Sequence, residues 1–386
     1  MREIKNTAVI AEYNPFHNGH KFHLEKTREL TGCENIIAVM SGNFTQRGEP
    51  AVFEKHIRVR HALENGADMV LELPVEYAAG AADIFAGAAV YIIEKSGIAD
   101  ALCFGSEQGS MEELELAAEV FAAESNEFKA YLAAYLSQGI SYPSARGKAA
   151  SKVLKHDIPF AALPNNILAV EYLAALKRLN SRILPFTVKR EQNGYNDLEL
   201  SGGISSAAAI RQSMAKGSIP VEAVPKNTLE SYKTVFLPKI DQYSDIFAYV
   251  LRTASKTELS EIADMTEGLE NRFLRCSDKA DISGIIEAAK TKRYTYTKLQ
   301  RAVLHTVLGI TKTMQNKVPA YIRVLGVRKD KKYLINELAA KSSLPVVTRV
   351  KENEELLKTE IKAGDIYHLL TDRATGSEYK NGMVMV

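Results

Sequence analysis

The sequence predicts an α/β protein with a parallel sheet, followed by a mainly helical region and a small α/β element at the end. Over the first half, short β-branched apolar runs alternate with longer stretches of helical spacing. The pattern turns helical from about residue 222 and returns to strand, helix and strand after residue 318. The chain has 386 residues, 46% of them hydrophobic, which is enough for two or three domains.

The first half supplies the predicted sheet. Four apolar runs too short for helices are expected as buried strands: residues 7–13, 35–40, 68–73 and 101–105. Helical spacing separates them, so the strands should be parallel and covered on both faces. After further helical stretches, residues 182–189 are expected to return to the sheet as a final strand.

Three units are predicted from the change of pattern along the chain. They are residues 1–220, which hold the parallel sheet, residues 221–317, which are mainly helical, and residues 318–386, which form a small α/β element. The boundary near 215–225 is marked by two prolines and a glycine in "GSIPVEAVPKNT".

Cysteine usage and hydropathy indicate the class of protein. The three cysteines are far apart and odd in number, which argues against a disulfide framework or a zinc site and favours a reducing compartment. The first apolar run is too short for a signal peptide, and no apolar stretch approaches the roughly 20 residues that cross a bilayer. We therefore expect a soluble cytoplasmic protein with no membrane association, and we predict no stable protein partner.

Charge is distributed unevenly between the two halves. Residues 1–213 carry 21 basic and 26 acidic residues, whereas residues 214–386 carry 28 basic and 21 acidic residues. A basic back half indicates contact with a polyanion, although an uneven scatter of solvated charges is an alternative explanation.

The stretch "EYNPFHNGHKFHLEK", residues 12–26, follows the first predicted strand. Ligands of open parallel sheets bind beyond the carboxyl ends of the strands, which is where this stretch lies. Pro15 and Gly19 fit a constrained turn, and His20 is expected to open a helix whose free N–H groups attract anions. The spacing of His17 and His20 can direct both rings to one phosphate, with His23 one turn further on. The alternative is a set of structural histidines, and a zinc site is less favoured.

Two signatures carry a resemblance to a known superfamily. "HNGH" and "SGGISSAAAIR" (201–211) resemble the paired signatures of the HIGH-motif nucleotidyltransferases, which bind ATP and attack its α-phosphate. With "EYNPFHNGHKFH", "SGNFTQRGEPA", "CFGSEQG", "PNNILAVEY" and "TVKREQNGYND", most of the chain is similar to the tRNA(Met) cytidine acetate ligases of that superfamily. Ala169 stands where glycine often follows "NNIL" in that family.

The resemblance implies a Rossmann-like nucleotidyltransferase domain and a two-step reaction. Acetate and ATP would give acetyl-adenylate and pyrophosphate, and the exocyclic amine of the wobble cytidine in elongator tRNA(Met) would then take the acetyl group. Mg²⁺ is expected on the phosphates of ATP, and no metal site made by the protein is predicted. The implied catalytic residues are His17, His20, Ser205, Ser206 and Arg211.

Other residues follow as candidates for binding ATP or the second substrate. The ATP candidates are Ile10, Ala11, Glu12, Tyr13, Asn14, Pro15, Phe16, Asn18, Gly19, His23, Gly105, Asn165 and Arg190. Gly105 has an ordinary strand end as its alternative role, Asn165 a helix cap and Arg190 a surface ion pair. Acetate or the incoming cytidine is expected at Ser41, Gly42, Gln46 and Arg47, whose two roles the sequence does not separate.

Basic and aromatic residues alternate in "KTKRYTYTKLQR", residues 290–301. This mixture suits phosphate contacts and base stacking on a folded RNA, and a solvated helix start with inward tyrosines is the alternative. The candidates for binding tRNA are Lys290, Lys292, Arg293, Lys298 and Arg301.

Two other functions compete with the RNA-modifying ligase. One is a small-molecule adenylyltransferase of the same superfamily, which would leave the basic back half without a purpose. The other is a non-enzymatic RNA-binding protein that kept a nucleotide pocket, which the intact "HNGH", "ISS" and Arg211 argue against.

Overall fold

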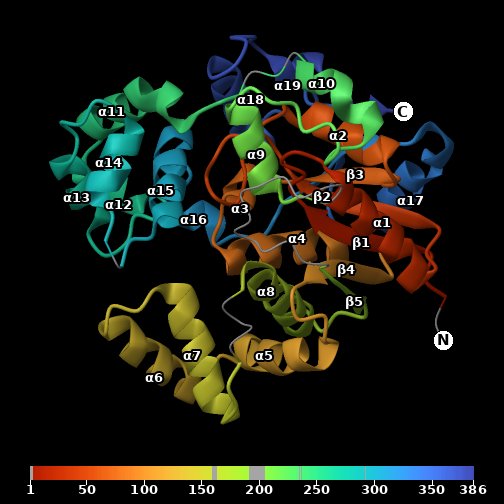
Figure 1. Cartoon of the computed structure of the whole chain (residues 1–386), viewed down its shortest axis with the longest axis horizontal. Coiled ribbons are helices and arrows are strands. Elements are labelled where there is room, and N and C mark those ends of the chain that lie inside the picture. The colour runs from red at the N-terminus through yellow and green to blue at the C-terminus, as the bar shows by residue number, and fades with distance from the viewer. Residues whose placement is uncertain (1–2, 159–162, 191–204, 234, 236, 292) are drawn as a thin grey trace.

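The computed structural model describes residues 3–158, 163–190, 205–233, 235, 237–291 and 293–386, and it is built on one eight-stranded sheet. The strands run in the order β5-β4-β1-β2-β3-β6-β7, and β8 pairs with β6 (Figure 1). Their bounds are β1 (Asn6–Ala11), β2 (Asn35–Ser41), β3 (Met69–Leu73), β4 (Ala101–Ser106), β5 (Leu184–Lys189), β6 (Ile322–Val327), β7 (Val346–Val347) and β8 (Val384–Met385).

All five strands predicted in the first half form, and they pair in parallel. β1 runs alongside β2 from Asn6 opposite Asn35 to Ala11 opposite Met40, and β4 and β5 continue the sheet on the other side of β1. β3 lies parallel to β2. The carboxyl ends of these strands therefore share one edge, which confirms the predicted Rossmann-like arrangement.

Helices cover both faces of the sheet, as predicted. The first-half helices are α1 (Asn18–Thr31), α2 (Lys55–Glu64), α3 (Val75–Ala78), α4 (Ala82–Ser96), α5 (Met111–Ala123), α6 (Asn126–Ser137), α7 (Tyr142–Leu154) and α8 (Pro164–Arg178). One apolar core joins α1 and α2 to side chains such as Val9 and Ala38, and another joins α4, α5 and α8 to their neighbours on the other face, such as Ala8 and Ile37. This alternation follows from the two-residue period of a strand.

The helical region is confirmed, and its helices share a core with residues of the sheet loops and of the tail. After α9 (Ala207–Ala215), the region contains α10 (Leu229–Lys233), α11 (Ser244–Thr253), α12 (Lys256–Glu261), α13 (Leu269–Arg275), α14 (Ile282–Ala289), α15 (Tyr296–Leu308) and α16 (Lys312–Gln315). Figure 1 shows α11 to α15 as a group of helices beside the sheet domain. Phe44, from the segment after β2, packs into their core, so this group contacts the loops of the sheet.

The tail forms strands and helices as expected, and it extends the same sheet. β6 pairs antiparallel with β3, and α17 (Tyr333–Lys341) packs Leu334 and Leu338 into the core shared with α4. α18 (Lys358–Leu369) and α19 (Ser377–Lys380) follow β7. The sequence did not indicate this pairing, because nothing in an isolated strand pattern identifies its neighbour. In the described residues, no helix combines the length and apolar character needed to cross a membrane.

Candidate active site

The "HNGH" stretch forms the start of α1 at the carboxyl end of β1. The helix begins at Asn18 and His17 is its N-cap, so it starts two residues before the predicted His20. Nδ1 of His17 accepts a hydrogen bond from the backbone N–H of Gly19 at 3.0 Å, and Nδ1 of His20 accepts one from His17 N–H at 3.3 Å. The two rings stack with their centroids 3.7 Å apart. The predicted meeting of these two histidines is therefore present.

Both rings are neutral donors in this arrangement. Burial lowers the pKa of His17 to about 3, with Arg190 and Arg211 adding to the effect, and burial together with His17 holds the pKa of His20 well below its usual value. Because each Nδ1 accepts a backbone hydrogen bond, each neutral ring carries its proton on Nε2. Two Nε2–H groups are thus available for an acceptor such as a phosphate oxygen.

The second signature reaches the first one through Arg211. Its Nη1 donates to the backbone oxygen of Asn14 at 2.8 Å. Ser206 caps α9, and its hydroxyl accepts from Ala209 N–H at 3.1 Å, while Ser205 is buried. Segments almost 200 residues apart in sequence therefore meet, as the two signatures predicted. The glycines of "SGGI" lie outside the described residues.

Gly105, Asn165 and Arg190 also come together, at the ends of β4 and β5. Arg190 donates to Oδ1 of Asn165 at 3.0 Å, and a Cβ added at Gly105 would lie 3.5 Å from Cγ of Arg190. The amide nitrogen of Asn165 donates to Glu107 at 2.6 Å. Asn165 lies inside the first turn of α8, whose N-cap is Leu163, so it does not cap the helix.

Glu107 is a member of this group that sequence reasoning missed. Its carboxylate accepts the backbone N–H groups of Asn165 and Asn166 at 3.1 and 2.8 Å. A carboxylate suits the first turn of a helix, where free N–H groups point outward. Glu107 directly follows the β4 strand, two residues beyond Gly105. This position at the ligand-binding edge of the sheet could have identified it from the sequence.

The remaining candidates of the first loop are buried or partly buried. Tyr13 and Phe16 are buried and contact the ring of His20 with centroid distances of 4.9 and 5.6 Å. Pro15 is also buried, and Ile10 and Ala11 end β1. Asn18 donates to the backbone oxygen of Glu222 at 2.8 Å, which joins α1 to the segment after α9. Burial lowers the pKa of His23 to about 4, with Arg190 contributing.

The loop after β2 lies on the same edge, as predicted. The backbone N–H of Gln46 donates to Glu12 at 2.6 Å, and burial raises the pKa of the Glu12 carboxyl against the opposing effects of this bond and of Arg211. Arg47 is exposed, and its charge acts on both Glu12 and Arg211. This places the loop of the expected substrate residues beside the histidine loop.

Two of the predicted substrate residues are fully buried. The Ser41 hydroxyl has no exposed surface. A Cβ added at Gly42 would lie 3.0 Å from Oε1 of Glu72 and 3.2 Å from Oε2 of Glu360. The structure therefore gives Gly42 a packing role, because a side chain here would crowd these two carboxylates.

Arg58 on α2 is a second residue that the sequence did not single out. It is fully buried, and its guanidinium donates to the backbone oxygens of Glu12 at 2.5 Å, Ser41 at 3.2 Å and Gly42. Its Nε also donates to Phe53 O at 3.0 Å. A planar guanidinium can hold several carbonyls at fixed angles. Arg58 thus joins the ends of β1 and β2, which carry the two loops of the site.

The predicted RNA-binding residues differ in their exposure. Arg301 is mostly buried and bonds both carboxylate oxygens of Asp264, at 2.8 and 2.9 Å, so the structure contradicts an exposed role for it. Lys298 donates to Thr266 at 2.7 Å. Lys290 and Arg293 are exposed with an acidic group 3.8 Å away in each case, and Lys292 lies outside the described residues. Tyr294 packs inward, whereas Tyr296 is exposed.

A buried group of charges lies below this edge, and we call it the Lys55 cluster. It consists of Lys55, Glu72, Arg323, Glu360 and Glu378. Nζ of Lys55 lies 2.6 Å from Glu72 and 2.7 Å from Glu378, and Arg323 bonds the same two carboxylates at 2.9 and 2.8 Å. The cluster therefore links α2 and β3 to three elements of the tail.

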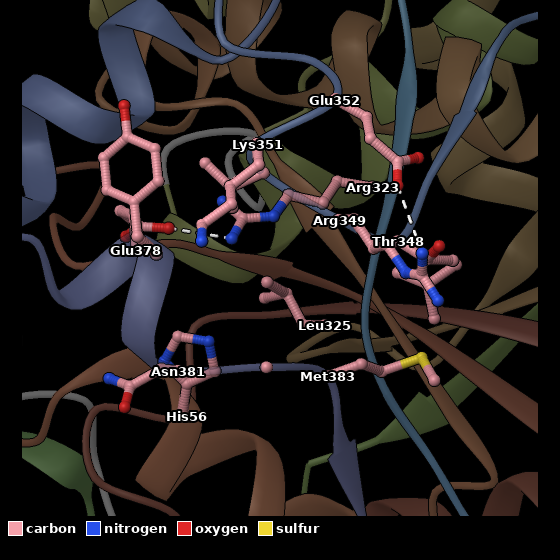
Figure 2. Close-up of a pocket in the computed structure, with 14 residues that line it drawn as sticks. His56, Arg323, Leu325, Thr348, Arg349, Lys351, Glu352, Glu378, Asn381 and Met383 are labelled. Carbon is pink, nitrogen blue, oxygen red and sulfur yellow. Dashed lines mark hydrogen bonds and ion pairs between the residues drawn. The ribbon is translucent and has the colours of Figure 1, made fainter.

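A cavity of about 290 Å³ opens beside the Lys55 cluster. Figure 2 shows Arg323 bonded to Glu378 and Arg349 bonded to Glu352 at its wall. Its lining residues include His56, Lys351 and Asn381 but none of the predicted site residues. The cavity is thus separate from the site at the carboxyl ends of the strands.

Comparison with known proteins agrees with this geometry. The family described as HIGH Nucleotidyl Transferase matches residues 4–381. A tRNA(Met) cytidine acetate ligase of Thermoanaerobacter sp. (strain X514) is 40% identical over 94% of both chains, and one of Acetivibrio thermocellus is 35% identical over 99% of this chain and 100% of its own.

Solved structures match the whole fold. An apo crystal structure of Thermotoga maritima TmcAL has a TM-score of 0.92 and 30% sequence identity over 99% of this chain and 100% of that one. A second structure of that protein, bound with alpha-thio ATP, has a TM-score of 0.90 and 29% identity, with the same coverage. The chain therefore belongs to the tRNA(Met) cytidine acetate ligase family of HIGH nucleotidyl transferases.

Proposed function

We propose that this protein activates acetate with ATP and acetylates the wobble cytidine of elongator tRNA(Met), giving N4-acetylcytidine, AMP and pyrophosphate. The observation that carries the proposal is the convergence of His17 and His20 with Arg190 and Arg211. Neither arginine forms an ion pair with a described carboxylate, and each donates to a neutral oxygen instead. Such a group of donors is suited to an anion that comes from outside the chain. The names of the relatives support the same reaction.

In the first step, an acetate oxygen attacks the α-phosphate of ATP and pyrophosphate leaves. Two anions must approach each other, so the reaction needs donors aimed at the charge that develops on phosphorus. We assign this role to the Nε2–H groups of His17 and His20 and to Arg211. Ser205 and Ser206 stand at the start of α9, whose N-terminal dipole suits the β- and γ-phosphates.

We assign the nucleoside of ATP to the ends of β4 and β5. Gly105 leaves the backbone open to close approach, and Asn165 and Arg190 supply an amide and a guanidinium. The network from Glu107 through Asn165 to Arg190 fixes the orientation of these groups. The bound ATP analogue of the Thermotoga maritima structure supports ATP as the nucleotide.

In the second step, the exocyclic amine of cytidine attacks the acetyl carbonyl and AMP leaves. We assign acetate and cytidine to the β2–α2 loop, with Gln46 and Arg47 at its outer end, because this loop is bonded to Glu12 beside the histidines. Ser41 and Gly42 shape the base of this loop through their backbone bonds to Arg58.

Mg²⁺ commonly binds the phosphates of ATP. In the described residues, no cluster of three or more His, Cys, Asp or Glu side chains fits a metal ion. Glu12, in the loop after β1, is influenced by the positive charges of Arg211, Arg58 and Arg47, which makes its surroundings unfavourable for a further cation. The described residues therefore do not fit a Mg²⁺ held by the protein, and we route no step through it.

We assign residues 1–220 to catalysis and residues 221–317 to tRNA binding, with the tail extending the sheet. Exposed Lys290 and Arg293, together with Lys292, are the candidates for phosphate contacts, and exposed Tyr296 is a candidate for base stacking. Arg301 is no longer among them, because Asp264 holds it.

The decisive test is acetate-dependent exchange of labelled pyrophosphate into ATP, with and without tRNA. We expect exchange without RNA, and transfer of acetate to elongator tRNA(Met) with release of AMP. A nonhydrolysable link between the α- and β-phosphates should block the reaction, whereas one between β and γ should be tolerated. Acetylation from acetyl-CoA alone, or release of ADP, would contradict the proposal. Exchange that needs a phosphorylated small molecule instead of acetate would favour the adenylyltransferase alternative.

A further inference from the structure

A basic segment without acidic residues lies inside the acidic first half of the chain. Residues 128–156 contain no aspartate or glutamate but include the basic residues Lys129, Arg146, Lys148, Lys152 and Lys155. This segment covers nearly all of α6 and the whole of α7. Figure 1 shows these two helices as a lobe that stands out from the sheet, below the group formed by α11 to α15.

Three exposed lysines lie on the outer side of α7 and at its C-terminal end. Lys148 and Lys152 are four residues apart within α7, which places them on one side of the helix, and Lys155 is the C-cap residue that directly follows it. Arg146, Ala149 and Ala150 of the same helix are buried. Lys148 and Lys152 lie about 6 Å apart along the helix axis, given a rise of 1.5 Å per residue, and Lys155 adds a third positive charge at the end of the helix.

These three charges are not neutralised by the chain itself. Within the described residues, none of the three lysines forms an ion pair, and Lys148 makes one noted contact, with the ring of Tyr135 at 5.9 Å. α7 contains no acidic residue that would offset them. Exposed lysines of other first-half helices, such as Lys26 and Lys177, are paired with glutamates.

The lobe is anchored firmly to the body of the protein. Arg146 bonds Glu171 of α8 at 2.8 Å and lies 4.2 Å from the ring centroid of Phe121 in α5, and Phe128 of α6 is fully buried. Arg146 is thus a structural cation, whereas the three lysines two to nine residues further along the chain are exposed to solvent. A rigid helix that presents only outward charges is suited to a fixed, extended anion.

We propose that the outer side and C-terminal end of α7, through Lys148, Lys152 and Lys155, bind the phosphate backbone of the tRNA substrate as a contact separate from the helical region. This inference rests on the proposed function. The charges are spread along the helix and lack a buried polar anchor, so they fit a polyanion better than a small ligand. Lysines act as point charges that neutralise phosphates without reading bases, so this contact should position the RNA and carry no sequence specificity.

The test uses the full chain with Lys148, Lys152 and Lys155 replaced together by alanine. Binding of elongator tRNA(Met) is measured at several salt concentrations. We expect the affinity to fall roughly tenfold or more at low salt and the slope of log affinity against log salt to decrease by roughly two to three units, at about 0.7 to 0.9 per lost phosphate contact. Acetate-dependent pyrophosphate exchange without RNA should equal that of the unsubstituted protein.

A second triple variant provides the matched control. Replacing Lys26, Lys177 and Lys341 by alanine removes the same charge from exposed lysines that are paired with glutamates. This variant should bind tRNA as the unsubstituted protein does. Equal tRNA affinity and salt slope in both triple variants would overturn the α7 surface while leaving the proposed function intact.

A binding assay with phospholipid vesicles distinguishes RNA from an anionic membrane surface as the ligand of these lysines. Loss of binding to phosphatidylserine vesicles in the α7 variant, with tRNA binding unchanged, would also overturn the proposal. If the unsubstituted protein shows neither acetate-dependent exchange nor tRNA binding, the proposed function and the α7 surface fall together.

Discussion

Positive charge is arranged differently in the Lys55 cluster and in the histidine site above it. In the cluster, Lys55 and Arg323 each bond the carboxylates of Glu72 and Glu378 within the protein interior. At the ends of β1 and β5, Arg190 and Arg211 bond neutral oxygens of Asn165 and Asn14. The cations of the cluster are therefore paired with carboxylates, whereas the two arginines of the site form no ion pair with a described carboxylate.

The pKa shifts follow the same division. Burial lowers the pKa of Lys55, but the neighbouring carboxylates outweigh this effect and raise it. Burial raises the pKa of Glu378, but Lys55 and Arg323 bring it down to about 2. Burial and Glu72 hold the pKa of Glu360 well above its usual value, which favours the neutral form of this third carboxyl. In the site, burial and nearby arginines lower the pKa of His17 and His23 instead, so these rings add no positive charge to that of the arginines.

The largest effect is expected from breaking the cluster. Lys55→Met leaves buried carboxylates without one of their cations, which should lower the free energy of unfolding by about 3–5 kcal/mol. Equilibrium urea denaturation measures this. Arg349→Met, in an exposed pair with Glu352, is the matched control and should cost about 0–1 kcal/mol. Equal losses in the two variants would mean that the cluster is no more important than a surface pair.

Removing a donor from the site should affect the rate and leave the fold intact. His20→Ala should slow acetate-dependent pyrophosphate exchange by about 10²–10³, the usual cost of losing a group that stabilises transition-state charge. His156→Ala, which changes an exposed histidine, is the control and should retain full exchange. Near-normal acetyl-adenylate formation by His20→Ala, with an unchanged thermal unfolding midpoint, would remove His20 from the mechanism.

Substitution of Arg58 tests whether a guanidinium is needed to hold the ends of β1 and β2 together. Lysine at this position keeps the charge but lacks the planar fork that reaches carbonyls of both strand ends, so Arg58→Lys should slow exchange on the order of 10- to 10²-fold through misplacement of the two loops. Arg60→Lys, two residues along the same helix and exposed, should behave as the unsubstituted protein. We expect ATP affinity to change less than the maximal rate. A selective loss of ATP affinity would instead assign Arg58 to nucleotide binding.

The smallest effect is expected in the pH dependence of stability. Burial lowers the pKa of His17 to about 3 in the folded protein, so between about pH 6.5 and 3 the unfolded chain binds a proton that the folded chain does not. Stability should therefore fall as pH decreases through this window, and His17→Gln should reduce that fall. Urea denaturation at pH 7.5 and pH 5.0 measures the difference. Identical pH dependence in the two proteins would contradict a neutral buried His17.

On the protein surface, too, some basic residues are paired with carboxylates and others are not. Sequence composition favoured the back half for RNA binding, and Arg301 was one of its candidates. Tertiary packing placed Asp264 against Arg301, while the three lysines of α7 received no carboxylate partner among the described residues. The composition of a segment gives its number of charges, but only the folded structure shows which of them are paired within the protein and which are accessible to a binding partner.

The sequence by itself determined the elements and the order of the catalytic motifs. Apolar period and length fixed all five parallel strands, and the glycine, proline and histidine pattern fixed the loop after β1, because these are local properties of the backbone. Tertiary structure alone decided that β6 pairs with β3, that Arg58 joins two strand ends and that Lys55 meets Glu378. These contacts join residues up to 323 positions apart, and their strength depends on burial and on charges brought from other segments, which no local pattern contains.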